Sequence, residues 1–106
     1  MLNKNKVWFI TGASRGLGLK IARAALSVGD KVIATARTIE GVAQKIGGSK
    51  ETLCVLPVDV TNPTSITSAI ELGKRTFGTI NVLVNNAGYG QLGSFETISQ
   101  NAIQRQ

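Results

Sequence analysis

The sequence has no histidine and a single cysteine, Cys54, among its 106 residues. A disulfide within the chain is therefore impossible, and a zinc site made of cysteine and histidine ligands is excluded. Long apolar segments are also missing: the run at residues 7–10 is too short for a signal peptide, and no segment is long enough to span a membrane. We therefore expect a soluble, cytoplasmic protein with no membrane partner and no metal site.

Aromatic residues are few, and acidic residues are outnumbered by basic ones. The aromatic residues make up 5% of the chain, and 12 basic against 6 acidic residues give a net charge of +6. The basic residues are scattered, whereas nucleic-acid-binding surfaces cluster basic side chains with aromatic ones. We therefore interpret the charge as solvated surface and predict no nucleic-acid partner.

Short apolar runs alternate with segments of helical periodicity along the chain. We predict strands at residues 7–10, 31–36, 52–60 and 80–84, and helices at 17–28, 38–48 and 63–77, with a further helix starting near residue 98. Such alternation indicates an α/β fold: a Rossmann-like, doubly wound parallel sheet, here partial, with strand order 3-2-1-4. Pro57 places the third strand at an edge of the sheet, because proline cannot donate a ladder hydrogen bond.

The helix boundaries and buried faces follow from individual residues. Asn62 and Pro63 form an N-cap followed by a first-turn proline, and Gly78 ends that helix. In the short helix before it, Val42 and Ile46 share one face. Gly41 weakens this helix, and the two glycines at 47–48 end it. For the first helix we expect an apolar face made of Leu17, Ile21, Ala24, Ala25 and Val28.

A glycine-rich turn, TGASRGLG at residues 11–18, joins the first strand to the first helix. Its pattern is T-G-x-x-x-G-x-G, which differs from both G-x-G-x-x-G and the P-loop. Glycines let a ligand approach the backbone closely, and the helix N-terminus offers free N–H groups and a positive dipole end. The turn therefore predicts a phosphate site, although it could also be only a tight connection.

Two arginines indicate which dinucleotide would bind. A carboxylate at the end of the second strand would hold the ribose 2′-hydroxyl of NAD, whereas an arginine accommodates the 2′-phosphate of NADP. The residue at that position is Arg37. Arg15, in the first helical turn, opposes the helix dipole at a cost of ~0.3–1 kcal/mol, which an anionic ligand would offset. Either arginine could simply reach into water, but together they favour NADP(H).

Three motifs in order give the chain a wider resemblance. The turn at residues 11–18, the Asp59-Val60 pair and the Asn85-Asn86-Ala87-Gly88 loop together resemble the short-chain dehydrogenase/reductase family. The resemblance implies that the aspartate contacts adenine and that the Asn-Ala-Gly loop lies along the nicotinamide side. Alternatively, Asp59 caps the helix at residue 62, and the two asparagines only connect neighbouring strands. The cofactor-binding residues expected overall are Gly12, Ser14, Arg15, Gly16, Leu17, Gly18, Arg37, Asp59, Val60, Asn86, Ala87 and Gly88.

The catalytic signature of that family is missing. Its members use a Tyr-x-x-x-Lys pair with a serine, but Tyr89 is followed four residues later by Gly93, and no lysine follows Lys74. We therefore assign no catalytic residue. We interpret residues 1–106 as a single domain: the NADP(H)-binding, N-terminal fragment of an oxidoreductase that transfers hydride between carbonyl and alcohol and binds a small-molecule substrate only when complete.

Two other functions remain open at this point. The chain could be a non-catalytic short product that binds nucleotide or dimerises, or a Rossmann-like domain that binds no cofactor. The fourth strand would be an exposed apolar edge without a further neighbour, so we expect the isolated chain to be marginally stable or to form a homo-oligomer.

Overall fold

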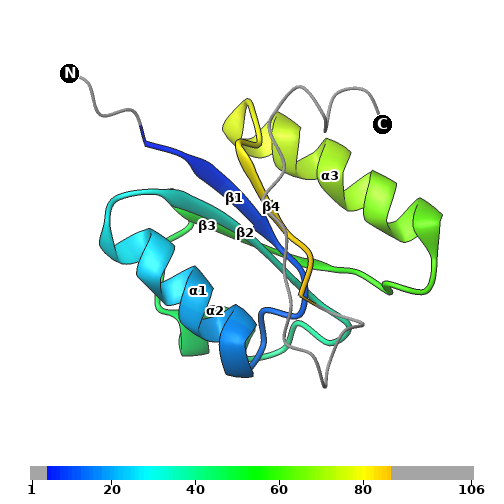
Figure 1. Ribbon diagram of the computed structural model, residues 1–106, viewed down its shortest axis with the longest axis horizontal. Helices are drawn as coiled ribbons and strands as arrows, with labels where there is room; N and C mark the ends of the chain where they lie inside the picture. The colour runs from blue at the N-terminus through cyan, green and yellow to red at the C-terminus, as the bar shows by residue number, and fades with distance from the viewer. Residues whose placement is uncertain (1–4, 87–106) are drawn as a thin grey trace.

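The computed structural model describes residues 5–86, which form one parallel sheet with helices on both faces (Figure 1). Strand order β3-β2-β1-β4 confirms the predicted Rossmann-like topology. The helix start predicted near residue 98 lies outside the described residues. The elements are β1 (Val7–Ile10), α1 (Gly16–Ser27), β2 (Lys31–Ala36), α2 (Val42–Ile46), β3 (Leu53–Pro57), α3 (Pro63–Phe77) and β4 (Val82–Val84).

Side chains alternate between the two faces of the sheet, and each face has its own core. Helices α1 and α2 cover the face that carries Ile10 and Val32, and α3 covers the face that carries Phe9 and Ile33 (Figure 1). All four of these side chains are fully buried. Burying an aliphatic or aromatic side chain of this size contributes about 1.5–3 kcal/mol. The central strands β1 and β2 are thereby fixed from both sides.

Strand β3 lies at the edge of the sheet, as Pro57 predicts, but it is shorter than expected. It ends at Pro57 and does not continue to residue 60. Val58 N still donates to Ala36 O at 2.9 Å, and the chain then enters a loop in which Thr61 binds the Asp59 carboxylate. The predicted extension was wrong because this local side-chain hydrogen bond replaces strand pairing.

Strand β4 also starts later than predicted, at Val82. Asn81 N donates to Val7 O at 2.9 Å, but Val7 N donates to the Asn81 side-chain Oδ1 at 2.8 Å. A side-chain oxygen thus takes the place that a backbone carbonyl would occupy in the ladder. Ile80 is nevertheless buried in the core under α3.

Helix α1 buries only part of the face expected. Its buried residues are Gly18, Ala22 and Ala25, whereas Leu17 is 40% exposed and Val28 is 69% exposed. The Ala24 side chain is also exposed, and Ile21 is half-buried. The prediction of the apolar face was therefore right for Ala25, and Ile21 packs partly buried against the core. It was wrong for Leu17, Ala24 and Val28, because the helix packs closely on the sheet through Gly18 and Ala22 instead.

The other two helices follow the sequence more closely. Asn62 Oδ1 accepts a hydrogen bond from Thr64 N at 3.0 Å, and Gly78 ends α3 with a φ of 89°. Helix α2 buries Val42 and Ile46 as predicted. It is shorter than expected because Gly41, with a φ of 78°, is its N-cap and lies outside the helix. No helix in residues 5–86 has both the length and the apolar character to cross a membrane.

Candidate functional site

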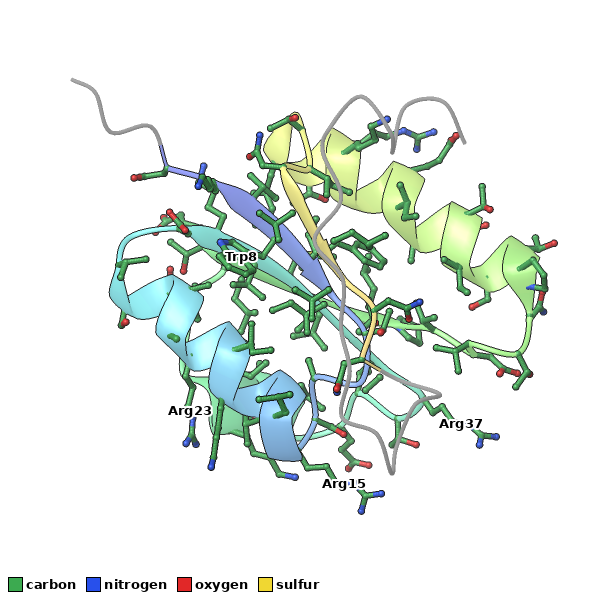
Figure 2. All side chains as sticks on the ribbon, in the orientation of Figure 1. Trp8, Arg15, Arg23 and Arg37 are labelled. Carbon is green, nitrogen blue, oxygen red and sulfur yellow. The ribbon has the colours of Figure 1, made fainter. Side chains whose placement is uncertain are left out.

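Polar and glycine-rich segments meet at the carboxyl ends of the four parallel strands. The strands pair in parallel, so the turn after β1, Arg37 after β2, Asp59 after β3 and Asn86 after β4 all lie at one end of the sheet. Figure 2 shows Arg15 and Arg37 extending from this end, at the bottom of the view. In doubly wound folds ligands bind at this end of the sheet.

The glycine-rich turn is hydrogen-bonded to both strands that flank β1. Thr11 N donates to Val84 O at 3.0 Å, and Ala13 N donates to Thr35 O at 2.9 Å. Gly12 between them has a φ of 64°, which favours glycine. These bonds hold the turn in one position relative to β2 and β4.

Two further glycines fulfil different steric needs. A Cβ atom on Gly18 would lie 2.2 Å from Gly12 O and 3.0 Å from Asn86 Nδ2, so α1 packs on the turn backbone without room for a side chain. Gly16 has a φ of 61°, and a Cβ atom there would meet nothing within 4 Å. Gly18 therefore allows close packing, while Gly16 leaves open space at the helix N-terminus.

The N-terminus of α1 is suited to an anion. Arg15 is its N-cap residue, but no side chain caps the helix, and its first turn has no acidic residue. The first N–H groups of a helix lack partners within it and carry its positive dipole end. The Arg15 guanidinium adds a full positive charge and, within the described part of the chain, forms no hydrogen bond or ion pair. Backbone and side chain therefore produce a positive potential at the same place.

Asp59 stays ionised in the loop after β3. Thr61 N and Thr61 Oγ1 donate to its Oδ1 at 3.0 and 2.6 Å. These bonds from Thr61 hold the pKa of the Asp59 carboxyl below its ordinary value, and the charge of Arg37 lowers it further. Asp59 does not cap α3, because Asn62 does so itself, although Asp59 O accepts from Asn62 N at 2.9 Å. A contact of Asp59 with adenine remains a prediction, as does the role of the neighbouring Val60.

Asn86 connects β4 to the glycine-rich turn. Its backbone N donates to Thr11 Oγ1 at 2.8 Å, and its side-chain Nδ2 donates to Gly12 O at 3.3 Å. The asparagine thus does connect neighbouring strands, the structural role that the sequence left open. Ala87 and Gly88, the other expected residues of this loop, lie outside the described residues.

One residue near the turn, Lys45, was not predicted from the sequence. Lys45, in α2, donates from Nζ to Ser14 O at 3.3 Å. It lies in a short, weak helix and matches no motif, so only the packing of α2 against α1 brings it to the turn. Among residues 5–86 no group of three or more acidic residues, cysteines or histidines could hold a metal ion.

Comparisons with known proteins agree with this geometry. Residues 6–106 match the family described as short chain dehydrogenase. Oxidoreductase BOA17 of Botryotinia fuckeliana (strain B05.10) is 47% identical over 94 residues, which is 88% of this chain and 34% of that protein. The chain thus spans about a third of the length of the curated relatives it matches.

Two solved structures contain a nicotinamide dinucleotide. The 3-ketoacyl-(acyl-carrier-protein) reductase from Brucella melitensis, complexed with NADH, has a TM-score of 0.70 and 34% identity, covering 78% of this chain and 34% of that chain. The C-domain of a bacterial malonyl-CoA reductase, with NADP, has a TM-score of 0.69 and 33% identity, covering 78% of this chain and 14% of that chain.

Proposed function

The chain belongs to the short-chain dehydrogenase family, and from this premise we propose that it binds NADP(H) at the carboxyl end of its sheet. We further propose that the whole protein is an oxidoreductase that transfers hydride between a carbonyl compound and an alcohol. When bound, the cofactor supplies or accepts the hydride at its nicotinamide ring. The residues of this chain bind and orient it.

The position of Arg37 is the main observation that supports NADP(H) as the cofactor. It directly follows β2, where a carboxylate would hold the 2′-hydroxyl of NAD(H). Its side chain is exposed and forms no hydrogen bond or ion pair with any residue between 5 and 86. A guanidinium with unused donors matches the geometry of a phosphate, which it can bind through two parallel hydrogen bonds.

The glycine-rich turn fits the pyrophosphate of such a cofactor. The open space at Gly16 and the uncapped N-terminus of α1 allow an anion to approach the backbone N–H groups. The close packing at Gly18 and the hydrogen bonds from Asn86 hold that backbone in place before a ligand arrives. A site that is already ordered loses less entropy on binding.

The chemical step needs a group that this part of the chain does not provide. Reduction of a carbonyl requires a proton donor within hydrogen-bond reach of the substrate oxygen. No residue between 5 and 86 is assigned that role. Our proposal for the described residues is therefore cofactor binding and orientation.

Titration calorimetry with NADPH and NADH tests the proposed cofactor. We expect wild-type protein to bind NADPH at least about tenfold more tightly, equivalent to about 1.4 kcal/mol. Arg37→Gln should remove most of this difference and leave the NADH affinity within about twofold. Arg75→Gln is the matched control, because Arg75 is exposed in the last turn of α3. Equal affinity of the wild type for both cofactors would refute the proposal.

A further inference from the structure

Lys45 brings a second positive charge to the glycine-rich turn, in addition to that of Arg15. It lies in the last turn of α2, and its Nζ donates to Ser14 O at 3.3 Å across 31 residues of sequence. Its ammonium group therefore lies beside the residue that precedes Arg15. This proximity results from helix packing and has no sequence motif.

Hydrogen bonds to its backbone carbonyl hold Lys45 in position. Arg23, from α1, donates to Lys45 O through Nε at 3.0 Å and through Nη2 at 2.7 Å. Val42 and Ile46, in the same helix, are buried in the core. In Figure 2, Arg23 extends from α1 toward the same lower end of the view as Arg15. Helix α2 is thus held against α1 by the two hydrogen bonds of the Arg23 guanidinium and by apolar packing.

The Lys45 ammonium has capacity for a ligand. A lysine offers three N–H donors, of which Ser14 O takes one. Its side chain makes no ion pair with any carboxylate in residues 5–86, and it is exposed. The remaining donors are therefore available to an anion that binds next to the turn.

Two cations, Lys45 and Arg15, lie at the glycine-rich turn, and a third, Arg37, follows the strand β2 to which that turn is hydrogen-bonded. Lys45 contacts Ser14, Arg15 is the next residue, and Ala13 N is bound to Thr35 O, two residues before Arg37. The three positive charges on this side of the sheet would each attract an anion that binds there. A phosphate with two negative charges matches this arrangement better than a neutral hydroxyl does.

We propose that Lys45 is a third specificity residue, which binds the 2′-phosphate and increases the preference for NADP(H) over NAD(H). This inference rests on the proposed cofactor site. Lys45 could instead bind the pyrophosphate, a group that both cofactors contain. Only a 2′-phosphate contact makes the effect of Lys45 depend on which cofactor is bound.

Affinities of Lys45→Gln for NADPH and NADH, measured by calorimetry, separate these alternatives. We expect NADPH to bind roughly 3- to 10-fold more weakly and NADH to change by less than about twofold. Lys45→Arg should keep most of the preference, because it keeps the charge. Lys50→Gln is the control: Lys50 is exposed but lies just before β3, near the amino end of the sheet. Thermal unfolding of each variant checks that it is folded.

Equal loss of both affinities would overturn the inference, because it would place Lys45 at the pyrophosphate or in a structural role. An unchanged NADPH preference in Lys45→Gln, alongside a preference lost in Arg37→Gln, would overturn only the assignment of Lys45. A wild-type protein that binds both cofactors equally would instead refute the proposed NADP(H) site.

Discussion

Replacing Gly18 by alanine should separate a ligand-binding turn from a simple chain connection. The new Cβ would lie 2.2 Å from Gly12 O and 2.9 Å from Gly12 C, so α1 and the turn must move apart. Alanine favours a helix interior by about 1 kcal/mol over glycine, while overpacking typically costs 1–3 kcal/mol. The obstructing atoms belong to the backbone, which cannot rotate away, so the overpacking cost should approach its upper limit. We expect a net loss of about 1–2 kcal/mol in the free energy of unfolding.

The same displacement should weaken cofactor binding. The N-terminal N–H groups of α1 move with the helix, away from the position that the turn defines. We expect the dissociation constant for NADPH to rise at least about tenfold, or 1.4 kcal/mol. Urea unfolding followed by the fluorescence of Trp8, the chain's one tryptophan, gives the stability, and calorimetry gives the affinity.

Gly73→Ala is the matched control. Gly73 is a buried helical glycine in α3, and its added Cβ would meet the Ile33 side chain, 2.5 Å from Cδ1 and 3.2 Å from Cγ1, with no backbone atom among the nearest contacts. Replacing Gly73 by alanine gains the same helix propensity as replacing Gly18, but its steric cost is smaller. Gly73 also lies on the opposite face of the sheet from α1. We expect its stability within about 1 kcal/mol of wild type and its NADPH affinity unchanged. A Gly18→Ala protein as stable as Gly73→Ala, with wild-type affinity, would refute our reading of the turn.

Two further predictions concern the loop after β3. Asn62→Ala removes the Oδ1 acceptor of Thr64 N and should lower the free energy of unfolding by about 1 kcal/mol, measured by urea unfolding; no change would show that the cap is dispensable. Thr61→Val removes the side-chain donor to Asp59, so the lowered pKa of that carboxyl should rise toward its ordinary value in an NMR titration. In wild type this carboxylate contributes stability above its unfolded pKa and loses it as pH falls through its folded pKa, and Thr61→Val should reduce that dependence. An unchanged Asp59 titration would contradict the assigned cause.

The strand order and several boundaries follow from the sequence for simple physical reasons. A proline inside a strand restricts it to an edge, which Pro57 confirms. Asn62 and Gly78 satisfy the ends of α3 by local hydrogen bonding and backbone conformation, so the residue types alone identify them. Alternation of strands and helices then leaves few topologies to consider.

Features that depend on tertiary packing were less predictable. The buried face of α1 is formed by small residues such as Ala22, because the close approach of the helix at Gly18 leaves no room for large ones. The late start of β4 depends on the Asn81 side chain, which replaces a backbone partner of Val7. Lys45 reaches the turn only because α2 packs on α1. None of these effects has a periodic or motif signal.

Reversing the charge of Arg37 shows whether this residue makes the site select a 2′-phosphate. In Arg37→Asp a carboxylate would stand where it can accept a hydrogen bond from a ribose 2′-hydroxyl and repel a 2′-phosphate. Dissociation constants for NADPH and NADH, measured side by side in wild type and variant, give the answer. We expect that the wild type prefers NADPH and that Arg37→Asp prefers NADH. A folded variant that keeps the wild-type preference would contradict this expectation.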